Sequence, residues 1–110
     1  MRRTETFWWY HFERGYCEWL GYRVEMDGLT FFIARSYGDA PESRDWYVTE
    51  ARSGYSSCAG GATISEALRN IRASVTKHGR EKYLRSIRKA IRENGESPWR
   101  AAEKARRRAA

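Results

Sequence analysis

Gly60-Gly61-Ala62-Thr63-Ile64-Ser65-Glu66-Ala67-Leu68 (GGATISEAL, residues 60–68) divides the sequence into two parts with different hydrophobic periodicity. Thr63 and Glu66 have the spacing of a capping box, in which each side chain meets a free backbone N–H at the start of a helix. Gly79 is expected to end this helix in the left-handed conformation. The amphipathic stripe of the helix, at steps of four, three and four, consists of Ile64, Leu68, Ile71 and Val75.

Upstream of this stretch, apolar and polar residues alternate with a period of two, which predicts strands. Asp27-Gly28 lies between two such runs and predicts a tight hairpin turn, because glycine tolerates the positive φ that the turn needs. Polar residues 36–45 are expected to form a loop, and residues 16–20 have no pattern that assigns them. The predicted strands cover residues 4–12, 22–25, 29–35, 46–51 and 55–59.

Two more helices are expected downstream. The first covers residues 80–93, with an apolar edge and a stop at Asn94-Gly95. The second starts at Ser97 as N-cap, with Pro98 at its first position, and continues to Ala110. Strands followed by helices predict an α+β fold, an antiparallel sheet of three to five strands packed on one amphipathic helix and followed by a basic helical segment. We expect one domain, with residues 1–79 as its body and 80–110 as its extension.

The net positive charge of the chain lies entirely in this extension. The chain of 110 residues has a formal net charge of +7. Residues 80–110 hold 11 Lys/Arg against 4 Asp/Glu, whereas residues 1–79 hold 10 of each. An asymmetry of this kind favours an acidic partner for one part of the protein. The predicted contact residues on the two helices are Arg85, Arg88, Lys89, Arg92, Arg100, Lys104, Arg106, Arg107 and Arg108.

Aromatic residues are the second unusual feature, since 5 Trp, 7 Tyr and 4 Phe exceed what a core of this size needs. In the strand over residues 4–12, alternation places Trp8 and Tyr10 on one face and Phe7 and Trp9 on the other. Stacking on bases or contact with a protein partner would use such side chains. The candidates for partner contact are Trp8, Trp9 and Trp99, although Trp99 could instead dock the last helix on the body.

An enzyme is not expected. The only soft metal ligands are His11, Cys17, Cys58 and His78, and their spacing is not that of a zinc site. The sequence therefore predicts no catalytic residue, no metal and no cofactor. Asp45, Glu50 and Glu66 are interpreted as surface or capping carboxylates. Cys17 and Cys58 could pair, but two buried thiols are the simpler interpretation. Without a signal peptide or an apolar run of about 20 residues, we expect a cytoplasmic protein with no membrane partner.

Part of the chain resembles a known family. Trp46-Tyr47-Val48-Thr49, then Gly54, then the segment from Gly61 to Leu68 is similar to the strand, turn and helix start of HicB-type antitoxins. The Pro- and Gly-rich segment that this family usually carries before the helix is replaced here by residues 55–59. The resemblance implies a sheet domain that occupies a partner protein while an appended basic segment contacts DNA.

Two functions follow from these patterns. The first is a non-enzymatic protein that contacts nucleic acid, or another polyanion, through its basic C-terminal helices. The alternative is a protein–protein interaction module or inhibitor, encoded by a phage or mobile element, with an anti-defence or antitoxin-like role. It would bind an acidic protein surface through aromatic and basic side chains. Either function is compatible with a homo-oligomer.

Overall fold

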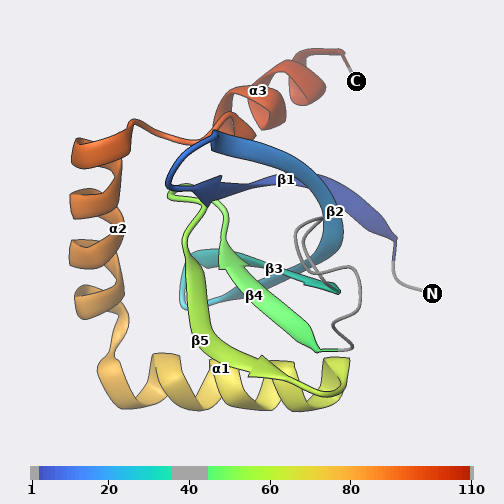
Figure 1. Ribbon diagram of the computed structural model, residues 1–110, viewed down its shortest axis with the longest axis vertical. Helices are drawn as coiled ribbons and strands as arrows, with labels where there is room; N and C mark the ends of the chain where they lie inside the picture. Colours follow the sequence, from blue (N-terminus) through green and yellow to red (C-terminus); the bar gives the residue numbers. More distant parts are fainter. Residues whose placement is uncertain (1–2, 36–44, 110) are drawn as a thin grey trace.

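The chain forms one antiparallel five-stranded sheet and three helices, as seen in a computed structural model that describes residues 3–35 and 45–109, with the backbone alone at 57–59. The strands follow one another in the sheet in chain order, so every neighbouring pair is antiparallel (Figure 1). The predicted α+β fold is confirmed. The strands are β1 (Thr4–His11), β2 (Gly15–Met26), β3 (Leu29–Arg35), β4 (Trp46–Glu50) and β5 (Ser56–Gly61).

The β2–β3 hairpin has the predicted two-residue turn. Met26 pairs with Leu29, and Asp27 and Gly28 both have positive φ, 51° and 74°. This conformation matches the twist of the flanking strands, and it is the reason that Asp-Gly is a strong hairpin signal. The predicted loop over residues 36–45 lies outside the described residues, except for Asp45.

The longest strand, β2, contains residues 16–20, which the sequence pattern does not assign. All eight residues of β1 pair with it, from Thr4 with Tyr22 to His11 with Gly15. Gly21 explains how this strand can cross its neighbours closely. A Cβ atom there would lie 2.9 Å from both the Ile33 carbonyl oxygen and the Phe7 ring. Glycine therefore permits the sheet to curl tightly at this point.

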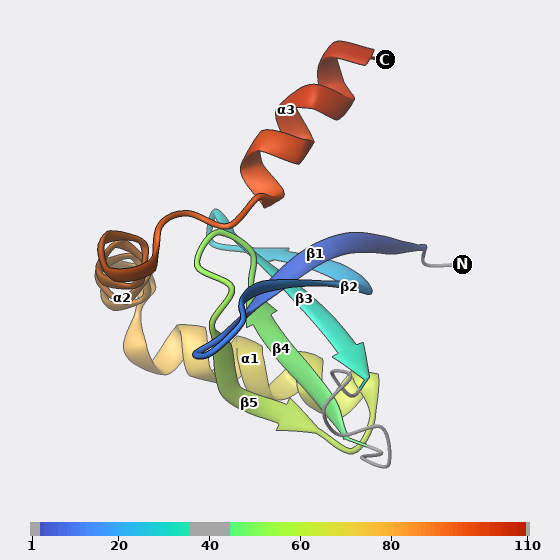
Figure 2. The same ribbon diagram turned by 45° about the horizontal axis from the view of Figure 1, so that its top comes forward.

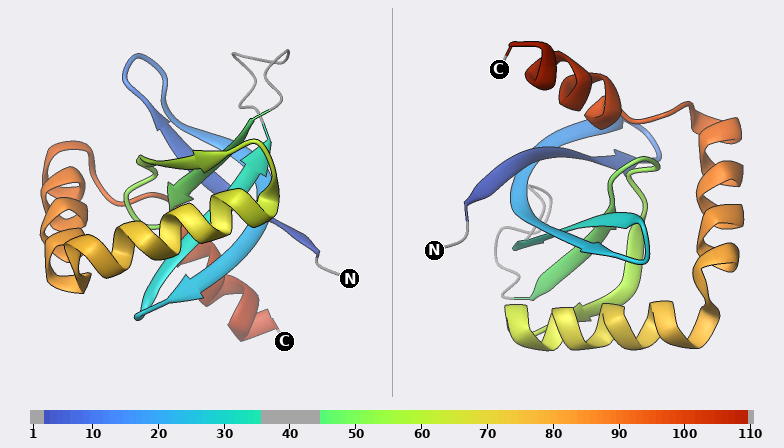
Figure 3. Two further views of the ribbon diagram at one scale, coloured as in Figure 1. Left: turned by 90° about the horizontal axis from the view of Figure 1, so that it is seen from below. Right: turned by 180° about the vertical axis from the view of Figure 1, so that it is seen from behind.

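The curled sheet is covered by helices on three of its sides, because α1, α2 and α3 follow one another around it (Figure 3). α2 starts at the predicted residue, and the other bounds differ from the predicted ones by one or two residues. The helices are α1 (Ile64–His78), α2 (Arg80–Asn94) and α3 (Trp99–Ala109).

One face of the sheet forms the main core with α1 and α2. Ile71 and Val75 of α1 are buried against this face, as the amphipathic stripe predicts, and Ile87 of α2 joins the same cluster. The second helix thus contributes to the body and does not hang from it, although the predicted extension starts at residue 80. The sheet side chains in this core are those of Leu29, Phe31, Ile33 and Val48.

A second, smaller core lies on the other face, inside the curl of β1 and β2. Phe7 and Phe32 stack with their ring centroids 5.0 Å apart, and Ala51 is buried beside them. The curl is completed by a hydrogen bond of 2.8 Å from the Tyr10 N–H to the Gly54 carbonyl. The N-terminal strand therefore reaches the turn that follows β4.

The helix ends agree with most of the local signals. The Thr63 side chain accepts a hydrogen bond of 3.0 Å from the Glu66 N–H, as a capping box requires. Ser97 Oγ accepts a hydrogen bond from the Trp99 N–H, at the first residue of α3, so Ser97 lies one residue farther from the helix than predicted. Gly79 ends α1 with a φ of 82° and a ψ of 154°, so the predicted left-handed helical conformation is wrong. Its φ is positive, but its ψ is extended, and α2 begins at the next residue.

Candidate functional site

The predicted cations of α2 lie together on one exposed side of the molecule. The helix buries Ile87 and Ala90 against the body, and residues at three- and four-residue spacing on the opposite side are exposed. This arrangement follows from the 3.6-residue period of the helix. We call these four residues the outer basic face: Arg85, Arg88, Lys89 and Arg92.

The predicted cations of α3 are divided between three directions. Arg100, Lys104 and Arg107, at positions i, i+4 and i+7, line a cleft beside the body. Arg106 turns toward β1, where its guanidinium lies 3.5 Å from Glu5 and 2.8 Å from Glu103. Arg108 is exposed. The two helices therefore do not present one continuous row of positive charge.

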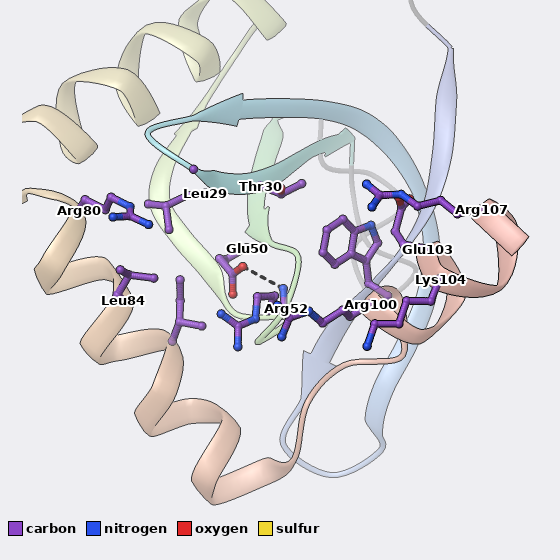
Figure 4. A pocket seen from close by; sticks show the side chains of 13 residues that line it. Leu29, Thr30, Glu50, Arg52, Arg80, Leu84, Arg100, Glu103, Lys104 and Arg107 are labelled. Atoms are coloured by element: carbon purple, nitrogen blue, oxygen red, sulfur yellow. Dashed lines mark hydrogen bonds between the residues drawn. The ribbon is translucent and has the colours of Figure 1, made fainter.

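The cleft has a volume of about 520 Å³ and lies between α2, α3, the β2–β3 turn and the end of β4. Arg80 and Leu84 stand on one side of it, the α3 cations on the other, and Arg52 between them (Figure 4). Arg80 and Arg52 are cations that the sequence analysis did not select. Arg80 is seven residues before Ile87, so the helical period places both on the same side of α2. This spacing could have predicted from the sequence that Arg80 faces the body. We call this site the basic cleft; its cations are Arg52, Arg80, Arg100, Lys104 and Arg107.

Few of the cleft cations have an internal counter-charge. Arg52 and Arg100 share Glu96, at 3.2 and 3.4 Å. Within the described part of the chain, Arg80, Lys104 and Arg107 form no ion pair. Cations without an internal counter-charge favour an anion in the cleft.

Glu50 lies in the floor of the cleft and is 6% exposed, so of the two predicted roles, surface or capping carboxylate, it does not have the first. Its carboxylate accepts hydrogen bonds from the backbone N–H groups of Arg52, at 2.8 Å, and Ser53, at 2.7 Å. It thus caps the turn after β4, as the capping interpretation predicts. Burial raises the pKa of Glu50, although the backbone hydrogen bonds act in the opposite direction.

A charged network holds α3 against the sheet. The Arg23 guanidinium pairs with Glu5 at 2.8 Å and also with Glu103 of α3. The same guanidinium lies over the Trp99 ring, 5.5 Å from its centroid. Arg106 links Glu5 and Glu103 from the solvent side. These contacts set the position of the cleft wall, because they fix the side of α3 that faces the sheet.

The aromatic candidates are mostly structural. Trp9 is 9% exposed and belongs to the second core, so its predicted role as an exposed contact is wrong. Trp8 is half-buried, and Trp99 packs against the second core with a buried indole N–H that has no hydrogen-bond partner among the described residues. Among the residues that the structure describes, the large exposed apolar side chains are others: Phe12, Trp19, Leu20 and Tyr55.

The remaining chemistry-bearing residues lie apart. Cys17 is a free thiol, while the Cys58 side chain lies outside the described residues. His11 Nδ1 accepts backbone hydrogen bonds in the β1–β2 turn, and His78 lies at the end of α1. Over residues 3–35 and 45–109, with the side chains at 57–59 left aside, no three His, Cys, Asp or Glu residues are grouped as metal ligands would be. Nor does any described helix have the length and apolar character to cross a membrane.

Comparison with known proteins gives no assignment. No protein-family model matches the chain, and searches of curated proteins and of solved structures return no match. The resemblance to HicB-type antitoxins over residues 46–68 is therefore not supported by a family match.

Proposed function

We propose that this protein is a non-enzymatic binding protein of the cytoplasm that contacts nucleic acid, or another polyanion, through α2, α3 and the cleft between them. One observation carries the proposal. Of the nine predicted contact cations, Arg100 and Arg106 form ion pairs, and the other seven form none within the described residues. Cations without internal partners can each neutralise a phosphate at no cost to the fold.

The physical basis of binding would be the release of counter-ions from the phosphate backbone. Each phosphate that a Lys or Arg neutralises frees condensed cations, and the affinity then falls as salt is added. The outer basic face is a convex helix surface with four cations at three- and four-residue spacing. A surface of this kind positions a phosphate backbone, whereas sequence recognition would need contacts with base edges.

The test is charge reversal with a matched control. Arg85, Arg88 and Arg92 are changed together to Glu, and the control carries the same change at Arg69, Arg72 and Lys77 on the exposed side of α1. Both variants change the net charge equally, and glutamate is as good a helix former as arginine. We expect the α2 variant to lose binding of labelled DNA and RNA, measured by fluorescence anisotropy, and the α1 variant to retain most of it.

A protein partner is the second candidate, and the exposed apolar residues near the β1–β2 hairpin favour it. Phe12 is 80% exposed and Leu20 57%, with Trp19 beside Leu20. Aromatic residues are enriched where proteins bind one another. If both charge-reversal variants bind nucleic acid equally, the outer basic face is not the interface; if the unaltered chain binds no nucleic acid, the protein partner takes precedence.

A further inference from the structure

The basic cleft differs from the outer basic face in the way that its cations are arranged. The outer face presents its charges in one row, on one side of one helix. The cleft brings together charges from three separate elements, Arg80 from α2, Arg52 after β4, and the Arg100, Lys104 and Arg107 series of α3. These charges stand around a cavity of about 520 Å³ (Figure 4). A row fits a backbone that passes across a surface, whereas a ring of cations fits one compact anion.

We infer that the basic cleft binds a phosphomonoester, either the terminal phosphate of a nucleic-acid strand or that of a free mononucleotide. A phosphomonoester carries a charge of about −1.5 to −2 at neutral pH and offers three acceptor oxygens on different sides. An internal phosphodiester offers a single charge. A single guanidinium group can bind two of these oxygens in the fork geometry that arginine favours with phosphate, and the cleft offers such a group on each side, Arg80 on one and Arg107 on the other.

The cleft retains its positive charge although two carboxylates line it. Glu103 is engaged by Arg23 and Arg106, on the side of α3 that faces the sheet. Glu50 directs its oxygens to the backbone N–H groups of Arg52 and Ser53, at 2.8 and 2.7 Å. Neither carboxylate forms an ion pair with a cleft cation in the described residues. A phosphate therefore has no internal competitor for Arg80, Lys104 and Arg107.

The apolar part of the cleft agrees with a ligand larger than phosphate alone. Leu29, Leu84 and Ile87 line the cleft, and the first two lie on the side opposite the α3 cations (Figure 4). Clefts of about 300–1,000 Å³ that combine apolar walls with a few convergent polar groups are typical small-molecule sites. A nucleoside could lie against this apolar wall while its phosphate meets the cations. The cleft thus has both kinds of surface that a nucleoside monophosphate needs.

This inference deepens the proposed function and rests on it where the phosphate belongs to a strand. The test uses the full chain and one oligonucleotide sequence in three forms, with a 5′-phosphate, with a 3′-phosphate and with hydroxyl groups at both ends, each labelled internally. Anisotropy gives the affinity of each strand, and calorimetry gives that of adenosine 5′-monophosphate, with adenosine as control. The cleft variant is Arg80→Gln with Arg107→Gln, and its matched control is Arg88→Gln with Arg92→Gln on the outer basic face.

For a strand end, we expect one phosphorylated strand to bind at least about tenfold more tightly than the hydroxyl strand, equivalent to 1.4 kcal/mol. The cleft variant should lose this difference, and the control variant should weaken all strands alike. Binding of adenosine monophosphate without an end effect would support the cleft and make the free mononucleotide its ligand. If the three strands bind equally and adenosine monophosphate does not bind, the inference is overturned and the proposed function stands. If adenosine monophosphate binds and no strand does, the cleft stands and the proposed function fails.

Discussion

The two basic helices, α2 and α3, have similar charge but are attached to the molecule in different ways. α2 buries Ile87 and Ala90, and Ile87 belongs to the main core. α3 has no buried residue, and its C-terminal end points away from the sheet (Figure 2). Its attachment depends on the half-buried Trp99 and on the pairing of Glu103 with Arg23.

This difference separates a permanent surface from a conditional one. Hydrophobic packing holds the outer basic face in place, and salt does not weaken that packing. Charged contacts hold α3, and salt screens such contacts when they are partly exposed. The basic cleft needs both helices in position. We therefore expect the outer basic face to persist under conditions in which the cleft loosens.

The largest expected effect tests whether α2 is part of the core. Ile87→Ala should lower the free energy of unfolding by about 2–4 kcal/mol, because it leaves a cavity where the side chain is 4% exposed. Urea unfolding followed by tryptophan fluorescence measures the change. Ala101→Ser on the exposed side of α3 is the control and should change it by less than about 0.5 kcal/mol. Equal effects of the two substitutions would remove the contrast between the helices.

The next effect tests the charged attachment of α3. Arg23→Met should lower the free energy of unfolding by about 1–2 kcal/mol, since Glu103, with its side chain 13% exposed, loses a charged partner. Circular dichroism should show loss of helix at temperatures below the main transition. Glu25→Gln removes a contact of 3.4 Å to the same arginine from an exposed carboxylate, and should have almost no effect. A response to Arg23→Met no larger than this control would contradict the attachment.

A pH effect is expected at Glu50, which lies between the two helices. Its folded pKa is raised by burial above the reference value of 4.5, so the folded state holds this proton more tightly than the unfolded state. This contribution to stability is present at low pH and is lost as pH rises from 4.5 through the folded pKa. The slope is at most about 1.4 kcal/mol per pH unit. The measurement is the unfolding free energy of the wild type minus that of Glu50→Gln, followed across that window. This difference should fall as pH rises, and a rise would contradict the direction of the shift.

The smallest effect is the salt dependence of α3 itself. Between 0.05 and 0.5 M NaCl, backbone amide exchange in α3 should accelerate by roughly fivefold, because screening weakens the contacts of Arg23 and Arg106 by up to about 1 kcal/mol. Amides around Ile87 in α2 should show little change. Hydrogen exchange read by NMR gives both values in one sample. Equal acceleration in the two helices would mean that they are attached in the same way.

Local features of the sequence were enough to predict most of the fold. The Asp27-Gly28 turn and the Thr63 cap depend on residues that are neighbours in the chain, and both are as predicted. The first half of β2 was missed, because its strand character comes from pairing with β1 and from the close crossing at Gly21. A hydrophobic pattern within one segment does not report contacts with other segments.

The candidate site was predictable only in part. The outer basic face follows from helical spacing and needs no tertiary information. The basic cleft depends on Arg52 and Arg80, which lie 28 residues apart and meet α3 only in the folded chain. Arg106 was predicted as a contact residue, yet it is paired with Glu5, at the other end of the sequence. Charge density alone could not separate free cations from engaged ones.

The central claim is that polyanion binding is electrostatic and is carried by the basic helices. Deleting residues 96–110 is a poor test, since Ser97 donates a hydrogen bond to the Ala51 carbonyl and Trp99 packs on the second core. The most direct measurement is the affinity of the intact chain for double-stranded and single-stranded DNA and RNA as salt is raised. We expect log affinity to fall linearly with log salt, with a slope of about −3.6 or steeper for duplex DNA, corresponding to four or more phosphates. No binding at low salt, or an affinity that salt leaves unchanged, would contradict the account.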